Sequence, residues 1–389
     1  MSSKRFNLRF AFFLMAYYMT NAVYQGYMSL HYTSLGLTST QTGAIFAAIA
    51  VVSVAAQPLW GICGDRVASR NRLIRFLVLA ASLSVLTFLL TDRFIPMLLL
   101  GCLFSCFYTS IQPMGDSVIL AALEKTNQPF GPIRLSGGMT FAVSSLIFGS
   151  FLNVPGREKW AVYFTAAFCM CMIPASYFLP DTPGYQSATG KRMSFGALLK
   201  NRNLVKLMLF VLPLQMAMGY FYTFFSPHFL SLEGANGSLH GWAYFIAAMG
   251  EVPYLLLSDR LYEKLGAGKL ICFSACALTL RWIILATTQS IPLILVCQLL
   301  HGGGFIVISV SMAKYISRNV PQELQASGQM LLAMVIFGLA RAAGNLGGGV
   351  LAGALGRQNV FFLTSVICAG TLLIFAPQFL RKNPKSVQK

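Results

Sequence analysis

Charged side chains are scarce in this sequence. Only 10% of its residues are Asp, Glu, Lys or Arg, and only 11 of the 389 are acidic. Soluble globular domains carry about 25% charged residues, so an ordinary soluble fold is excluded. Hydrophobic residues make up 56% of the chain, and apolar runs of about 20 residues, each long enough to cross a bilayer, recur along its whole length. The sequence therefore predicts an all-α membrane protein with many spans.

Residues that carry chemistry are also sparse. The sequence has 4 His and 9 Cys, and they show no Cys/His spacing typical of a zinc site. An intramembrane enzyme would need a nucleophile paired with a base, or a set of metal ligands, and the scattered His and Cys supply neither. We therefore expect no enzyme activity, no bound metal and no organic cofactor.

The net charge of +18 is unevenly distributed along the chain. Of the 29 Lys and Arg, 22 fall in the tails and in alternate loops, 4 in the opposite loops and 3 inside apolar runs. This asymmetry is the positive-inside pattern, and it predicts a multi-pass protein of the cell membrane with both termini in the cytoplasm. It also argues against nucleic acid as a partner. The first apolar run lacks a small-residue cleavage site, so we expect it to be a retained span.

We expect twelve transmembrane helices arranged as two pseudo-symmetric six-helix bundles. A polar stretch rich in Pro, Gly and basic residues divides the apolar runs into two groups of six, which predicts an N-terminal bundle over 1–180, a cytoplasmic linker over 181–202 and a C-terminal bundle over 203–389. The predicted spans are 10–33, 41–62, 73–91, 95–122, 134–153, 160–179, 203–230, 240–258, 269–289, 291–313, 325–352 and a last one that ends near Leu380.

Three consecutive spans each carry one ionisable residue. These are Glu251, Arg281 and His301. A charge in hydrocarbon is costly, so such residues face the interior of a helix bundle or a water-filled cavity and usually pair with one another. Mixed signs, together with a group that titrates near neutral pH, indicate a solute pathway with proton coupling. The alternative is a structural ion-pair network, which apolar packing replaces at little loss of stability.

Several short motifs occur together and in order along the chain. With them, the chain resembles the lactose permease and phenylpropionate permease branch of the major facilitator superfamily over all twelve predicted helices. The motifs are Gln57-Pro58-Leu59-Trp60-Gly61, Phe130-Gly131 followed by Arg134-Leu135 and Gly137, Met249-Gly250-Glu251, Leu280-Arg281, Leu300-His301 and Lys314-Tyr315-Ile316.

A loop typical of this superfamily follows the second predicted span. Gly61 precedes the acid–base pair Asp65 and Arg66 by three intervening residues, although Ala68 stands where the usual motif has a second Gly. The resemblance implies a conformational latch. Physically, Asp65 is suited to cap a neighbouring helix N-terminus and to pair with an Arg.

The resemblance also implies a site. In lactose permease an acid and an Arg 18 residues apart hold the sugar, and Asp116 and Arg134 have that spacing. By the same resemblance, Glu251 links the solute and proton sites, while Arg281 and His301 take part in proton coupling. Two further positions complete the implied binding site, namely Phe141, where lactose permease has a sugar-stacking Trp, and Arg341.

Three departures from the lactose permease pattern argue against its usual proton site and against sugar as substrate. Gly304 stands where that permease carries its principal proton-carrying Glu, and Gln298 replaces a Lys. The acids of its seventh helix, which balance basic residues, are also absent. Three Arg then face two acids in the expected cavity, and this surplus of positive charge favours an anionic solute.

We therefore expect a monomeric symporter that imports a small organic acid, with an aromatic acid favoured, together with protons. A proton symporter for sugars or nucleosides is the alternative. A drug–proton antiporter is a further one, although the Pro expected in its fifth helix is missing between Arg134 and Asn153. A membrane sensor that transports nothing also fits the sequence.

Overall fold

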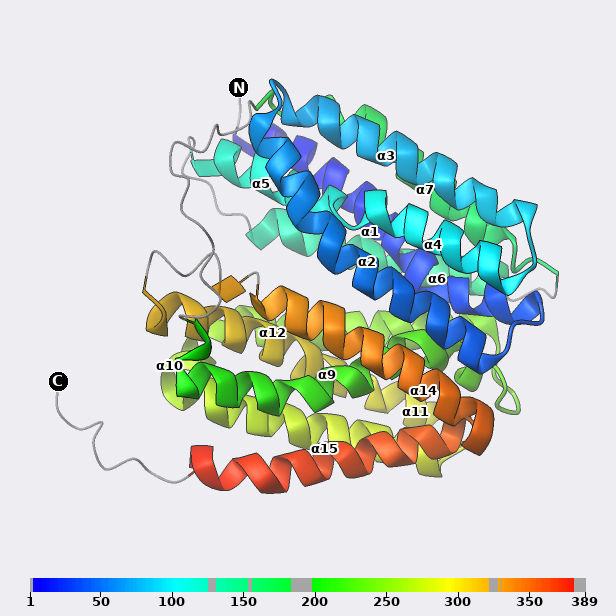
Figure 1. The fold of residues 1–389 in the computed structure, drawn as a ribbon, viewed down its shortest axis with the longest axis vertical. Coiled ribbons are helices and arrows are strands. Elements are labelled where there is room, and N and C mark those ends of the chain that lie inside the picture. Colours follow the sequence, from blue (N-terminus) through cyan, green and yellow to red (C-terminus); the bar gives the residue numbers. More distant parts are fainter. Residues whose placement is uncertain are drawn as a thin grey trace.

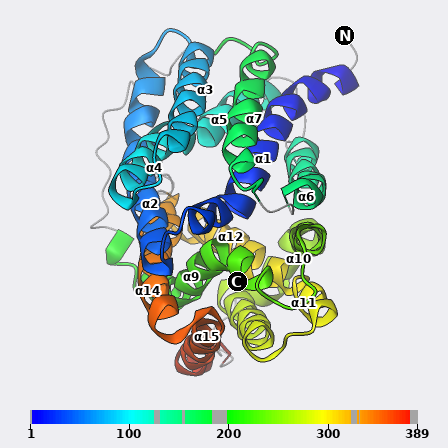
Figure 2. The ribbon, with the colours of Figure 1, turned by 90° about the vertical axis from the view of Figure 1, so that its right-hand side faces the viewer.

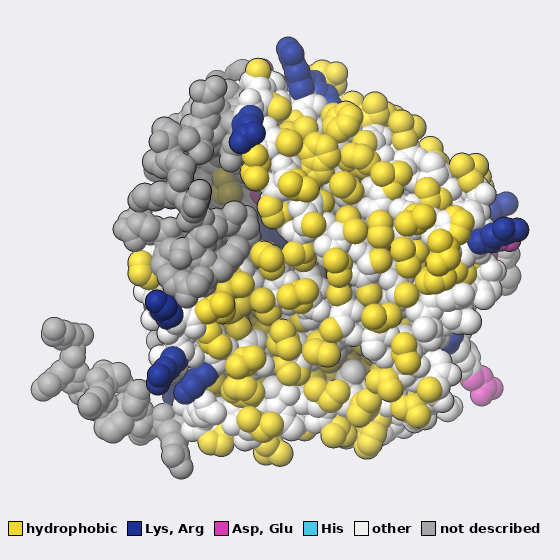
Figure 3. All heavy atoms as spheres, viewed as in Figure 1, with side chains coloured by type: hydrophobic (Ala, Val, Ile, Leu, Met, Phe, Trp, Pro, Cys, Tyr) yellow, Lys and Arg dark blue, Asp and Glu magenta, His cyan; other side chains and the backbone are white. Residues whose placement is uncertain are grey.

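The chain folds almost entirely into helices. The computed structural model describes residues 3–124, 131–152, 156–182, 198–321, 328–329 and 331–380, and within these ranges it contains no strand (Figure 1). Large hydrophobic side chains cover the face seen in Figure 3 over both halves of the chain, while Lys and Arg gather at its edges. Large apolar side chains are exposed in the described parts of both halves, among them Leu90 at 81% and Leu373 at 75%. This surface is that of a protein surrounded by lipid.

The first group of helices runs up to Ser176. It comprises α1 (Ser3–Ser34), α2 (Ser39–Arg66), α3 (Arg70–Leu86), the short η1 (Thr87–Leu90), α4 (Phe94–Tyr108), α5 (Ile111–Glu124), α6 (Gly131–Leu152) and α7 (Trp160–Ser176). The second group comprises α9 (Arg202–Phe229), α10 (Gly237–Thr287), α11 (Ile291–Cys297), α12 (Leu300–Asn319), the π-helix η2 (Met334–Ala340), α14 (Arg341–Leu355) and α15 (Arg357–Leu380).

The described ranges make twelve passes. Nine stretches are long and apolar enough to cross a bilayer. One of them, α10, is two passes, because Gly266 adopts a φ of 71° and the chain turns back there. Glu251 and Arg281, each 15 residues from Gly266, both contact His301, so the two arms run antiparallel. With α1 and the shorter α7, the predicted number of spans is reached.

Two predicted spans are interrupted in the structure. The predicted helix 95–122 is divided between α4 and α5, with Pro113 in the first turn of α5. Because proline has no N–H, the carbonyl of Thr109 loses its helical donor, and the side-chain Nε2 of Gln57 lies 3.4 Å from that carbonyl oxygen instead. The predicted helix 291–313 is divided between α11 and α12 at Gln298 and Leu299. Both interruptions lie beside the polar residues described below.

Each group of helices has an apolar core of its own. One cluster of buried side chains draws its members from residues 10–179, and the other from residues 198–368. Figure 2 shows the first group of helices on one side of the molecule and the second group on the other. Each half therefore packs around its own apolar core. Most of the expected linker, 183–197, lies outside the described residues, so the boundaries 1–180, 181–202 and 203–389 stay a prediction.

The two halves meet closely at one end of the molecule. We call it the closed end; it is where α1 passes into α2 and α9 into α10, opposite the start of α1 and the end of α15 (Figure 1). There Gly149 of α6 lies against Gly241 of α10 so tightly that a Cβ on Gly149 would sit 2.9 Å from the Cα of Gly241. Ser226 of α9 donates a hydrogen bond of 2.8 Å to the carbonyl of Gly26 in α1. Small residues allow this approach of helix backbones.

This packing predicts the effect of a larger residue at the closed end. Gly149→Val should force α6 away from α10, since overpacking costs about 1–3 kcal/mol and every 1.4 kcal/mol shifts a population roughly tenfold. Spin labels at Arg93 and Glu233, in closed-end loops of opposite halves, should then report longer distances. Gly370→Val is the matched control, because a Cβ there meets open space. Equal distance distributions for the two variants would contradict the role of Gly149.

Candidate functional site

Asp116 of α5 and Arg134 of α6 form an ion pair in the N-terminal half. The Nη1 of Arg134 lies 3.4 Å from the Oδ2 of Asp116, and the guanidinium carbon lies 5.1 Å from the ring centre of Tyr18 on α1. The side chain of Arg134 is 42% exposed and that of Asp116 is 22% exposed, although both residues belong to membrane spans. They therefore border a space that water or a solute can enter.

Gln112 belongs to this cluster and was not expected from the sequence. It lies one helical turn before Asp116, with its amide between Tyr18 and Asp116 at 3.4 and 3.5 Å. With the amide turned over, its oxygen accepts from Arg134 and its nitrogen lies 3.3 Å from the hydroxyl of Tyr17. The four-residue spacing from Asp116, which places both side chains on one helix face, is the sequence signal that identifies it.

The C-terminal half contains a chain of three ionisable side chains. An Nη1 of Arg281 lies 2.8 Å from the Nδ1 of His301, and the Nε2 of His301 lies 3.3 Å from an Oε1 of Glu251. Arg281 is completely buried, whereas the side chain of Glu251 is 24% exposed. The chain thus runs from a buried cation to a carboxylate that solvent can reach.

Two glycines bring the backbones that carry this chain together. A Cβ on Gly250 of α10 would lie 2.6 Å from the carbonyl oxygen of Leu299, and one on Gly302 of α12 would lie 2.8 Å from the Cα of Glu251. Such distances are too short for real side chains. Their absence lets α10 and α12 approach until Glu251 reaches His301.

Aromatic and amide groups complete the surroundings of Arg281. Gln298, which directly follows α11, accepts a hydrogen bond from the Nη2 of Arg281 through its Oε1. The ring of Phe221 on α9 lies 4.0 Å from the guanidinium carbon, so the cation also rests on an aromatic face. Gln298 is three residues from His301 and lies in the turn that separates α11 from α12.

Tyr222 connects the His301 chain to Arg341. Its hydroxyl lies 3.2 Å from the Nε2 of His301, and its ring centre lies 4.9 Å from the guanidinium carbon of Arg341. The ring of Phe305 lies 5.7 Å from the same carbon. Arg341 begins α14, directly after the π-helix η2, and π-helical turns are frequent at functional sites.

The two clusters face each other across the interface between the halves. Tyr18 lies within electrostatic range of Asp116 and Arg134 in its own half and of Glu251 in the other. Phe141 of α6, expected as a stacking residue, lies with its ring centre 6.3 Å from that of Tyr244 on α10. The structure thus brings residues expected at the site together from both halves, and their roles stay predictions.

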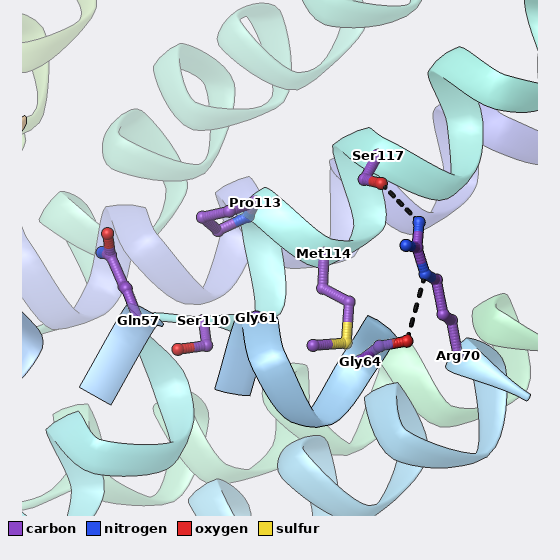
Figure 4. Close-up of a pocket in the computed structure, with 8 residues that line it drawn as sticks. All are labelled: Gln57, Gly61, Gly64, Arg70, Ser110, Pro113, Met114 and Ser117. Carbon is purple, nitrogen blue, oxygen red and sulfur yellow. Dashed lines mark hydrogen bonds between the residues drawn. The ribbon is translucent and has the colours of Figure 1, made fainter. Parts of the chain in front are cut away.

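The residues of the expected latch lie at the C-terminal end of α2, which is the end away from the closed end of the molecule. Gly61 and Arg66 are exposed, while the side chain of Asp65 lies outside the described part of the structure. The cation that the structure does bury there is Arg70 of α3, whose Nε lies 3.3 Å from the carbonyl oxygen of Gly64 and whose Nη1 lies 2.9 Å from the Oγ of Ser117 (Figure 4).

A cavity of about 160 Å³ lies between α2, α3 and α5 beside Arg70. Gly61 forms part of its wall, and a Cβ there would meet open space (Figure 4). This end of α2 is therefore loosely packed compared with the closed end. Among the described residues, no group of three or more His, Cys, Asp or Glu is placed to hold a metal ion.

Comparison with known proteins points to one superfamily. The chain is 27% identical over 353 residues to a maltose permease of Geobacillus stearothermophilus, with 87% of this chain and 86% of the relative aligned. It is 23% identical over 316 residues to a probable 3-phenylpropionic acid transporter of Escherichia coli (strain K12), covering 79% and 81%. The crystal structure of a point mutant of the nucleoside transporter NupG has the same fold, with a TM-score of 0.86, 15% identity and coverage of 96% and 100%.

These relatives are all transporters, and none is described as an enzyme. The sequence matches the MFS_1 like family over residues 7–363, which is most of the chain. The fold class and the resemblance expected from the sequence are thereby confirmed. The chain belongs to the MFS_1 like family and is a secondary transporter of the major facilitator superfamily.

Proposed function

We propose that this transporter imports a small organic acid together with protons. The observation that carries the proposal is the composition of the interior site. Among the residues that the structure describes, Asp116 and Glu251 are the acidic groups of the two polar clusters, and Arg134, Arg281 and Arg341 are their basic groups. With His301 neutral, these residues sum to a charge of +1.

A surplus positive charge in a membrane interior is expensive unless an anion compensates it. A carboxylate suits this role, because the planar fork of a guanidinium can donate to both of its oxygens. Arg134 and Arg341 are the two arginines of the site that are not fully buried. They are therefore the groups that we assign to the solute, and the rings of Tyr18, Phe141 and Tyr222 favour an aromatic one.

Glu251 is the group that we assign to proton coupling. It is partly exposed, and His301 connects it to the buried Arg281. When Glu251 takes up a proton, the positive charge of Arg281 loses its nearest compensation. An anionic solute restores the balance, so the proton and the solute favour each other's binding, which is the thermodynamic requirement for symport.

One chain supplies the whole proposed site, because each half contributes residues to it. We therefore propose that the monomer is the functional unit. The few basic residues of the opposite loops, among them Arg93 and Arg357, lie at the closed end. If both termini are cytoplasmic, as the charge distribution predicts, the described conformation is closed toward the outside of the cell.

Sugars and nucleosides are the second candidate class, which the names of the maltose permease and of NupG favour. The probable 3-phenylpropionic acid transporter favours the aromatic acid. The relatives include transporters of both classes, so the charge of the site decides our choice between the two classes.

The first prediction concerns the pair in the N-terminal half. Asp116→Ala and Arg134→Ala should each abolish solute binding, since each leaves its partner without compensation beside the solute. Isothermal titration of purified protein measures this effect. Arg318→Ala is the matched control, because Arg318 pairs with Glu263 at 3.5 Å outside the site. Binding at wild-type affinity in both site variants would remove the pair from the solute site.

The second prediction concerns Glu251. Glu251→Gln keeps the shape of the side chain but removes the titratable group, so proton-driven accumulation in proteoliposomes should be lost while solute exchange without a gradient persists. Glu233→Gln, in an exposed position beyond α9, should accumulate solute normally. Full accumulation by Glu251→Gln would exclude Glu251 as the proton-carrying group.

The third prediction separates the two solute classes. An aromatic carboxylate should compete for binding roughly tenfold to a hundredfold better than its amide, since hydrogen bonds to a charged group are worth about 1.5–3 kcal/mol. The measurement is displacement of labelled solute by matched acid and amide pairs. If the amide, a disaccharide or a nucleoside competes as well as the acid, the substrate is neutral and the organic acid is excluded.

A further inference from the structure

The hydrogen bonds around His301 determine which of its nitrogens carries the proton. A guanidinium has N–H donors and no acceptor. Because an Nη1 of Arg281 lies 2.8 Å from the Nδ1 of His301, that nitrogen must be the acceptor and is unprotonated. The Nε2 then carries the hydrogen of the neutral ring, and it lies within reach of the carboxylate of Glu251 and of the hydroxyl of Tyr222.

A second proton on His301 conflicts with this arrangement. It would place an N–H at Nδ1 directly opposite an N–H of Arg281, and a second positive charge beside a completely buried one. Of the groups around the imidazole, only the carboxylate of Glu251 would offset this repulsion. The groups that face the ring in the described structure are Arg281 and Glu251 from α10, Phe221 and Tyr222 from α9, Phe305 from α12 and Arg341 from α14.

The orientation of Arg281 in turn depends on Gln298. The amide nitrogen of Gln298 donates a 3.0 Å hydrogen bond to the carbonyl of Ile294, one turn earlier in its own helix, and its oxygen accepts from the Nη2 of Arg281. One end of the amide is thus anchored to backbone, and the other holds one nitrogen of the guanidinium. The second terminal nitrogen, Nη1, is then directed at His301.

We propose that Gln298 is a positioning residue that acts through Arg281. By holding the guanidinium in place, it keeps His301 neutral with its hydrogen on Nε2, so that Glu251 alone takes up the transported proton. The proposal deepens the proton coupling proposed above and rests on it. It assigns a role to a position where the resemblance to lactose permease implied none, since Lys stands there in that protein.

The direct test is ¹⁵N NMR of the histidine side chains in the full-length protein in lipid nanodiscs. The signal of His301 is assigned by its loss in His301→Gln. In the wild type we expect an unprotonated Nδ1 and a protonated Nε2 at neutral pH. In Gln298→Leu the guanidinium loses its anchor, so we expect a mixture of ring states.

Gln215→Leu is the matched control. Gln215 is also a completely buried amide, and in the described part of the structure its side chain makes no hydrogen bond. Losing it should leave the signal of His301 unchanged. Should Gln298→Leu fail to fold, Gln298→Asn provides the same test, because it keeps the amide but is too short to reach both Ile294 and Arg281.

Transport measurements distinguish a positioning role of Gln298 from a role in packing alone. Gln298→Leu should lose proton-driven accumulation at least tenfold while its solute affinity stays within about twofold of wild type. A wild-type His301 that is doubly protonated or carries its hydrogen on Nδ1 would overturn the proposal, and so would a Gln298→Leu variant with a wild-type spectrum. The NMR experiment needs no transport, so a wild type with the expected spectrum but no proton-driven accumulation would instead refute the proposed symport.

Discussion

The buried guanidinium of Arg281 is the constraint on which the polar interior of this transporter depends. A cation without solvent in the middle of a membrane span must be compensated, and removing one partner from a buried charged network costs about 3–5 kcal/mol. Here no carboxylate touches it in the described structure; Gln298, His301 and the ring of Phe221 surround it, and Glu251 compensates it from the far side of His301. A change in the charge of Glu251 therefore alters the electrostatic energy of Arg281, which water cannot reach.

This compensation is possible only because helix backbones come unusually close. Gly250 and Gly302 lack the side chains that would keep α10 and α12 apart, and the distance from Glu251 to His301 depends on that approach. The same use of glycine recurs at the closed end, where Gly149 and Gly241 bring α6 and α10 together across the two halves. Burial of apolar surface does not drive helices together in a membrane, because the lipid is apolar too. Close packing of helix backbones therefore supplies much of the attraction.

The two halves contribute unequal clusters to their common interface. The N-terminal cluster, with Asp116 and Arg134, is a balanced pair that is partly exposed. The C-terminal cluster has the deeper burial and the surplus cation, since Arg281 and Arg341 face the single carboxylate of Glu251. A solute bound between them would contact the Asp116–Arg134 pair on one side and Arg341 on the other, close to the chain of Arg281, His301 and Glu251. This division fits the separate tasks of holding a solute and responding to a proton.

The sequence by itself determined the class of the protein. Scarcity of charge, apolar runs of membrane length and the order of short motifs predicted an all-α transporter of this superfamily, because the bilayer admits few ways to satisfy a backbone. It also indicated which ionisable positions to examine, since a charge inside an apolar run is conspicuous. The roles of Asp116, Arg134 and Glu251 nevertheless stay predictions.

Only the tertiary structure decided which polar groups meet. Spacing in the sequence places Gln112 near Asp116 and Gln298 near His301, but it does not show that the two amides contact Arg134 and Arg281, because these arginines lie on other helices. The interruptions before α5 and α12, the π-helix before Arg341 and the buried Arg70 were likewise invisible to hydropathy. Hydropathy reports how each helix meets lipid, whereas function here depends on how helices distant in sequence meet one another.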